Sequence, residues 1–106
     1  MPVDYYTVAT SDELPPGERL IVEIGHHVVA LFNVDGQYYA IADVCTHDDG
    51  PLADGKLFGC EIECPRHYAR FDLRDGSVTA PPAVRPVPVY PVRVVGNEIQ
   101  VEVDAS

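Results

Sequence analysis

Two short segments of the chain each place a cysteine beside a histidine. His47 follows Cys45 by two positions, and His67 follows Cys64 by three. Sixteen residues lie between His47 and Cys64, so the pattern reads C-x-H, sixteen residues, C-x-x-H. Thiolates and imidazoles are ligands that suit zinc and iron. The spacing therefore predicts a metal centre held by two loops, each offering one sulfur and one nitrogen ligand.

The mixed composition of each pair bears on the kind of centre. A two-iron, two-sulfide unit needs two protein ligands on each iron, and two cysteines can hold one iron while two histidines hold the other. Each loop then gives one ligand to each iron. A structural zinc site also accepts two cysteines and two histidines, but it usually takes like ligands from one knuckle. We expect a [2Fe–2S] cluster on Cys45, His47, Cys64 and His67, with a zinc site as the alternative.

The elements that must position these ligands are short strands. Apolar and polar residues alternate with a period of two, and no segment sustains a 3.6-residue period, so we expect an all-β fold. Asp35-Gly36 and Gly96-Asn97 have the residue types of tight hairpin turns. The predicted strands cover residues 4–8, 19–24, 27–32, 37–43, 89–95 and 98–103.

The middle of the chain, residues 44–83, differs from the rest. It contains all three cysteines and many glycines, and strands are predicted there only at residues 56–60, 61–63 and 70–72. We interpret it as a small cluster-binding subdomain inserted into an antiparallel β-sandwich or barrel. The base then comprises residues 1–43 and 84–106 of a single domain, because 106 residues cannot form two independent cores.

Acidic residues dominate the charge of the chain. Seventeen Asp and Glu residues face 7 Lys and Arg residues, for a formal net charge of −10. This excess argues against nucleic acid and anionic membranes as partners, and it favours a partner with a basic face. The N-terminal residues show neither a basic nor an apolar signal region, and no run is long enough to span a bilayer. A cytoplasmic location is therefore expected.

The two motifs resemble the cluster loops of Rieske ferredoxins. CTHDDGP at residues 45–51 is similar to the first loop, ECPRHYARFDLRDG at residues 63–76 to the second, and Pro81-Pro82 to the proline loop of that family. The resemblance implies a soluble one-electron carrier between a flavin-dependent ferredoxin reductase and a terminal, aromatic-ring-hydroxylating oxygenase, without catalysis by this chain alone. It also implies that His47 and His67 form an exposed tip where electrons enter and leave.

Two other functions stay open beside this one. The first is a bound Rieske accessory subunit of another redox enzyme, such as the small subunit of a nitrite reductase. The second is a zinc-stabilised interaction module.

Several positions depart from high-potential members of the Rieske family. Gly50 and Arg66 occupy the places of a loop-to-loop disulfide, while Ala69 and Phe71 replace a Ser and a Tyr that donate hydroxyl hydrogen bonds to cluster sulfurs. Fewer such hydrogen bonds stabilise the reduced cluster less. Carboxylates in and near the loops oppose reduction as well. We predict a reduction potential near the low end of the Rieske range, about −150 mV. The six carboxylates are Asp43, Asp48, Asp49, Asp54, Glu61 and Glu63.

Two further residues, Tyr68 and Cys60, lie in or near the motifs and are not predicted to be ligands. Tyr68 follows the second histidine, where the family commonly has glycine. It is interpreted as a tolerated loop substitution, with a role in shaping the docking edge as the alternative. Cys60 ends an apolar stretch and is expected to be a small buried side chain rather than a ligand.

Overall fold

A computed structural model describes residues 3–104 of the chain. Eleven strands and one 3-10 turn make up its regular structure within that range. The strands are antiparallel wherever they pair, which confirms the all-β prediction. The elements are β1 (Val3–Thr10), η1 (Ser11–Glu13), β2 (Arg19–Ile24), β3 (His27–Val34), β4 (Gln37–Ala42), β5 (Leu57–Phe58), β6 (Glu61–Glu63), β7 (Arg70–Asp72), β8 (Val78–Ala80), β9 (Val89–Tyr90), β10 (Val92–Val95) and β11 (Glu98–Asp104).

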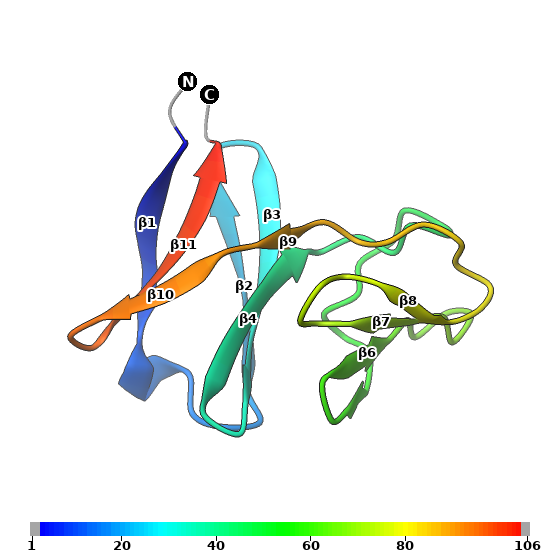
Figure 1. Cartoon of the computed structure of the whole chain (residues 1–106), viewed down its shortest axis with the longest axis horizontal. Coiled ribbons are helices and arrows are strands. Elements are labelled where there is room, and N and C mark those ends of the chain that lie inside the picture. The colour runs from blue at the N-terminus through cyan, green and yellow to red at the C-terminus, as the bar shows by residue number, and fades with distance from the viewer. Residues whose placement is uncertain (1–2, 105–106) are drawn as a thin grey trace.

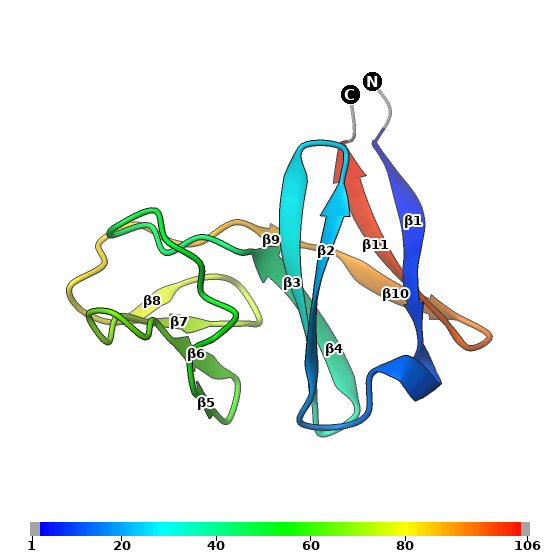
Figure 2. The same ribbon diagram turned by 180° about the vertical axis from the view of Figure 1, so that it is seen from behind.

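The strands form three sheets that lie side by side in layers (Figure 1). The first sheet has the order β1-β11-β10, the middle sheet β2-β3-β4-β9 and the third β5-β6-β7-β8. The same order of layers is visible from behind (Figure 2). One core lies between the first and middle sheets, and a second core lies between the middle sheet and the third sheet with its loops. The middle sheet is therefore covered on both faces.

The sequence of β3 reflects this double burial. Val29 and Leu31 belong to the core toward the first sheet, while Ala30 and Phe32 belong to the core toward the third. A strand buried on both faces is expected to have a continuous apolar run rather than an alternating one. β11 shows the opposite pattern, because Ile99 and the alternate valines after it are buried while Glu98 and the other polar residues between them face outward.

Both predicted hairpin turns are present. Asp35 and Gly36 have φ angles of 53° and 90°, which is the left-handed region that a two-residue turn between β3 and β4 requires. Gly96 has φ 63° between β10 and β11. Asn33 is buried beside the first turn, where its side chain donates to the Leu14 carbonyl (2.8 Å) and accepts from the Gly36 N–H (2.8 Å). These contacts set the register of β3 and β4.

The predicted single strand over residues 89–95 is wrong. It is two strands: β9 pairs with β4 in the middle sheet, and β10 pairs with β11 in the first sheet. Pro91 separates them, and proline has no N–H to continue a ladder. The chain therefore changes sheets at this residue. The 3-10 turn η1 and strand β8 were not predicted.

The third sheet arises entirely from residues 57–80 and is placed beside the middle sheet (Figure 1). One hydrogen-bonded link between them comes from Arg19 on β2, whose Nη1 donates to the carbonyls of Ala53 (2.6 Å) and Gly55 (2.5 Å). Gly55 has no room for a side chain, because a Cβ would lie 1.7 Å from the Glu63 carbonyl oxygen. Among the described residues, no helix is long and apolar enough to cross a membrane.

Candidate metal centre

The four predicted ligands lie in two loops with the same backbone pattern. The Cys45 N–H donates to the carbonyl five residues later (2.6 Å), and its own carbonyl accepts from the N–H four residues later (2.7 Å). The Cys64 loop repeats both bonds, at 2.7 and 3.0 Å. The residue four positions after each cysteine is left-handed: Asp49 has φ 63° and Tyr68 has φ 65°. Each loop thus turns its cysteine inward and its histidine outward.

Burial separates the sulfur ligands from the nitrogen ligands. The side chains of Cys45 and Cys64 are fully buried in the core beside the middle sheet, whereas His47 and His67 are exposed. The two imidazole rings lie 5.1 Å apart between centroids, with an angle of 87° between their planes. The structure therefore brings together all four residues that the spacing predicts, as an inner pair of thiols and an outer pair of imidazoles.

This arrangement tests which metal unit the residues fit. The ligand atoms of Cys45, Cys64 and Asp48 lie within 4.8 Å of one another, and within residues 3–104 that group includes neither imidazole. A single tetrahedral zinc needs all four ligands around one point. A two-iron cluster needs a sulfur end and a nitrogen end. The separate pairs fit the second case.

The surroundings of Cys45 favour binding to a metal over a free thiolate. Burial raises the pKa of the Cys45 thiol, and the backbone N–H of His47 acts in the opposite direction. A coordinated metal replaces the proton and removes the cost of a buried uncompensated charge. The same N–H is then placed to donate to the metal-bound sulfur.

An ion pair between the two ligand loops was not predicted. The Arg66 guanidinium binds both carboxylate oxygens of Asp48, with Nε to Oδ2 at 2.6 Å and Nη2 to Oδ1 at 3.0 Å. Hydrogen bonding from Arg66, followed by that from the Gly50 N–H, holds the pKa of Asp48 far below its usual value. Gly50 leaves room for the pair, since a Cβ there would lie 2.5 Å from Arg66 Cζ. The sequence signal for this ion pair was Asp48 directly after His47 and Arg66 directly before His67.

The structure shows what each of the six carboxylates in and near the ligand loops contacts. Asp43 is an internal cap whose Oδ1 accepts from the N–H groups of Leu52 and Ala53, both at 2.8 Å. Glu63 pairs with Arg70 at 3.2 Å, and Glu61 accepts from the Thr79 hydroxyl at 3.0 Å. With Asp48 bound to Arg66, four of the six carboxylates have internal partners, and Asp49 and Asp54 are the exposed ones.

The proline-rich segment, residues 80–88, lies against the first ligand loop. The Thr46 hydroxyl donates to the Arg85 carbonyl (2.6 Å), and Arg85 Nη2 donates back to the Thr46 carbonyl (3.1 Å). This segment is held beside His47 as a third loop of the tip. Cys60 lies outside the ligand group and is half-buried, so the expectation of full burial is wrong.

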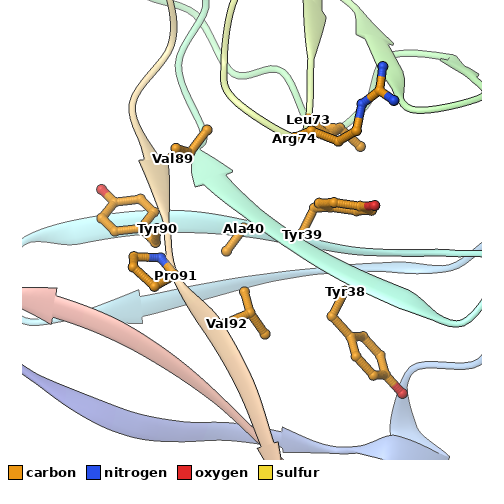
Figure 3. Close-up of a pocket in the computed structure, with 9 residues that line it drawn as sticks. All are labelled: Tyr38, Tyr39, Ala40, Leu73, Arg74, Val89, Tyr90, Pro91 and Val92. Carbon is orange, nitrogen blue, oxygen red and sulfur yellow. The ribbon is translucent and has the colours of Figure 1, made fainter.

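A hollow between the middle sheet and the β7–β8 turn is a separate feature (Figure 3). Tyr39, Leu73 and Arg74 line one side of it, while Val89, Tyr90 and Pro91 line the other. Its lining contains no Cys, His, Asp or Glu residue that could ligate a metal. This hollow is therefore no second candidate for the metal centre.

Comparisons with known proteins agree with this geometry. The Rieske [2Fe-2S] domain family matches residues 4–91, which implies one [2Fe–2S] cluster per chain. The biphenyl dioxygenase ferredoxin subunit of Pseudomonas sp. (strain KKS102) is 43% identical over 99 residues, covering 92% of this chain and 91% of that protein.

Two solved structures share the fold. The ferredoxin of carbazole 1,9a-dioxygenase from Nocardioides aromaticivorans IC177 has a TM-score of 0.87 and 39% identity, covering 92% of this chain and 95% of that one. A chain in the complex of reduced oxygenase and oxidized ferredoxin in carbazole 1,9a-dioxygenase has a TM-score of 0.87 and 32% identity, covering 92% of each chain. With its paired thiols, its paired imidazoles and these matches over most of its length, the chain belongs to the Rieske [2Fe–2S] family.

Proposed function

We propose that this chain is the ferredoxin component of an aromatic-ring-hydroxylating dioxygenase system. It accepts one electron from a flavin-dependent ferredoxin reductase and delivers it to a terminal oxygenase. Its relatives are named as ferredoxin components of such systems, and one similar chain is found in a complex with an oxygenase. This chain is an electron-transfer component and performs no catalysis alone.

Our proposal for the ligands follows the two pairs of side chains. Cys45 and Cys64 hold the buried iron, and His47 and His67 hold the outer one. The bound [2Fe–2S] cluster supplies a one-electron redox couple. The apolar core around both cysteines excludes water from the sulfur end, and the exposed imidazoles give a partner an edge to approach.

The observation that carries this function is the exposure of both imidazoles above buried thiols. An electron carrier must bring one side of its redox group to the molecular surface while protecting the other from solvent. A zinc-stabilised module has no need of such asymmetry. Each ligand loop has one residue in the left-handed region. The loops turn the cysteine and the histidine to opposite sides, which produces this asymmetry.

The test uses the purified full-length holoprotein. We expect a reddish-brown protein whose reduced form gives an EPR signal with a low average g value. After reduction with dithionite, it should reoxidise rapidly when mixed with the terminal oxygenase of carbazole 1,9a-dioxygenase or of the biphenyl dioxygenase of strain KKS102. A colourless protein with stoichiometric zinc would refute the proposal, and stable co-purification with another redox enzyme would favour an accessory subunit.

A further inference from the structure

We propose that Tyr68 anchors an apolar docking surface around the two imidazoles, and that the terminal oxygenase meets it with an apolar patch rather than a basic one. The inference rests on the proposed function and names the chemistry of its partner's surface. We call this docking surface the collar, and it consists of four exposed residues: Pro65 and Tyr68 of the second ligand loop, and Val84 and Pro86 on either side of Arg85.

The conformation of Tyr68 is costly for the chain by itself. Its φ of 65° lies in the left-handed region, where a residue with a Cβ is less stable than glycine. Its ring is 65% exposed, so burial within the chain does not compensate. No described residue stacks on the ring or hydrogen-bonds its hydroxyl. A molecule that covers Tyr68 would therefore gain contact area that this chain leaves exposed.

The position of the collar links it to electron transfer. Tyr68 follows His67 directly in the second ligand loop. Val84 is 88% exposed and precedes Arg85, which is hydrogen-bonded in both directions to Thr46 beside His47. Apolar side chains thus flank both imidazoles. A partner that covers the collar brings its own redox group to the histidine edge.

Charge pairing within the tip argues against a docking mode that depends on a basic partner. Asp48 is bound at both oxygens by Arg66, and Glu63 is paired with Arg70. Asp49 is exposed, and the exposed Arg85 is hydrogen-bonded to Thr46, three residues before Asp49. The acidic excess lies mostly elsewhere, because residues 1–43 and 84–106 contain 10 of the 17 carboxylates and three of the seven cations. The two ion pairs therefore leave fewer carboxylates near the imidazoles free to attract a basic partner.

Tyrosine is well suited to anchor such a contact. It presents a large, rigid surface that loses little conformational entropy when it is covered, and it is enriched among residues that dominate interface energetics. Its place beside a ligand puts it near the centre of the contact area, where such residues have their largest effect. We expect most of the apolar contribution to docking to come from this ring.

The experiment follows reoxidation of the dithionite-reduced holoprotein by either terminal oxygenase named above, by stopped flow, across a range of oxygenase concentrations. Tyr68→Ala and Tyr68→Gly should raise the half-saturating concentration about tenfold, an effect typical of a central interface residue. Tyr68→Phe should stay within about twofold of wild type. Tyr68→Gly should also raise the melting temperature, because glycine tolerates the left-handed backbone.

Two controls separate docking from the properties of the cluster. Ile21→Ser removes a comparably exposed apolar side chain on β2, in the base, and should leave reoxidation unchanged. Reoxidation by ferricyanide, the midpoint potential and the EPR spectrum should be the same for wild type and every Tyr68 variant. Raising the salt concentration from about 0.05 to 0.5 M should slow reoxidation less than about threefold, because salt screens charge–charge attraction and apolar docking does not depend on it.

The outcomes distinguish the two proposals. If wild type reduces the oxygenase and Tyr68→Ala or Tyr68→Gly does so with an unchanged half-saturating concentration, the inference is overturned and the proposed function stands. A salt effect greater than threefold would likewise overturn the apolar mode of docking. If the wild-type holoprotein reduces neither oxygenase, the proposed function falls and the inference falls with it.

Discussion

At the scale of single residues, the four proposed ligands differ in what each can do. Cys45 and Cys64 are buried and are proposed to hold the cluster in place, while the exposed His47 and His67 would connect it to the surface. Their chemistry follows from residue type, because thiolates and imidazoles tune the two ends of the cluster differently. Cys60 has the same chemistry as Cys45, but its place outside the group excludes it.

Replacement of a ligand should abolish the cluster, whereas replacement of the third cysteine should not. We expect His67→Ala and Cys64→Ser to give a colourless protein, because each leaves one iron with an incomplete set of ligands. Cys60→Ser is the matched control and should keep the visible spectrum and two irons per chain. Iron analysis and absorption spectroscopy measure both. Loss of colour in Cys60→Ser would show that the ligand assignment is wrong.

The buried Ala69 offers a test of the predicted low potential. It stands where high-potential relatives have a serine, and it is fully buried next to the second ligand loop. Ala69→Ser should raise the midpoint potential by about 40 mV, because one added hydrogen bond of roughly 1 kcal/mol stabilises the reduced cluster. Ala69→Gly adds no hydroxyl and should leave the potential nearly unchanged. A potentiometric titration measures the midpoint potential of wild type and both Ala69 variants. A clearly positive wild-type midpoint would contradict the prediction of about −150 mV.

At the scale of elements, the two ligand loops are joined by side chains rather than by a covalent bond. The Asp48–Arg66 pair connects residues 18 positions apart, one from each loop. The room above Gly50 allows Arg66 to reach across. By the family resemblance, Gly50 and Arg66 stand where high-potential Rieske proteins have a loop-to-loop disulfide, and here Arg66 pairs instead with Asp48, two residues before Gly50. This ion pair keeps the loops together reversibly and without oxidation.

Loss of this ion pair should make the cluster easier to remove. We expect Arg66→Gln and Asp48→Asn each to speed bleaching of the visible spectrum in chelator severalfold, because the loops separate more readily. The double variant should be no worse than Asp48→Asn alone, because that variant already weakens both the pair with Arg66 and the 3.3 Å contact between Asp48 and His67 Nδ1. Arg70→Gln is the control, because its partner Glu63 lies on the neighbouring strand of the same sheet. Equal bleaching of that control would contradict a special role for the pair.

At the scale of the whole molecule, the middle sheet joins two unlike parts. One face packs on the first sheet, and the other packs on the core that contains both cysteines. The division into a base of residues 1–43 and 84–106 and a cluster-binding subdomain of residues 44–83 stays a prediction. It is supported by the sheets, because every strand of the third sheet lies within residues 57–80.

Arg19 should couple these two parts. Its two hydrogen bonds to the carbonyls of Ala53 and Gly55 are partly buried, and its guanidinium lies 5.4 Å from the centroid of the Phe32 ring. We expect Arg19→Leu to lower the free energy of unfolding by about 2 kcal/mol, the usual size for hydrogen bonds to a charged group. The visible circular dichroism of the cluster should then disappear at lower denaturant than the far-ultraviolet signal.

The matched control for Arg19 is another arginine whose contacts stay within one sheet. Arg93 lies on β10, hydrogen-bonds Gln100 and stacks on Tyr5. Arg93→Leu should leave the two transitions coincident. If Arg19→Leu also unfolds in one coincident transition with unchanged stability, the coupling role is wrong.

Much of this protein follows from local features of its sequence. The four ligand types and their spacing predicted the metal centre, alternation predicted β11, and Asp35-Gly36 predicted the turn after β3. These features depend on residues close together in the chain, where backbone and turn preferences act directly. The same local character explains why spacing alone could suggest both proposed ligand loops.

Contacts between residues distant in sequence determine which charged side chains pair and which surfaces are exposed. Two of the six carboxylates in and near the loops are paired with cations, because Arg66 reaches Asp48 across the ligand loops and Arg70 reaches Glu63 across strands. The change of sheet at Pro91 likewise depends on two neighbours distant in sequence, β4 and β11. Long-range pairing of this kind is a property of the packed chain, and no local pattern encodes it. The exposed residues around the histidines accordingly include the apolar collar with Tyr68 as well as Asp49 and Arg85.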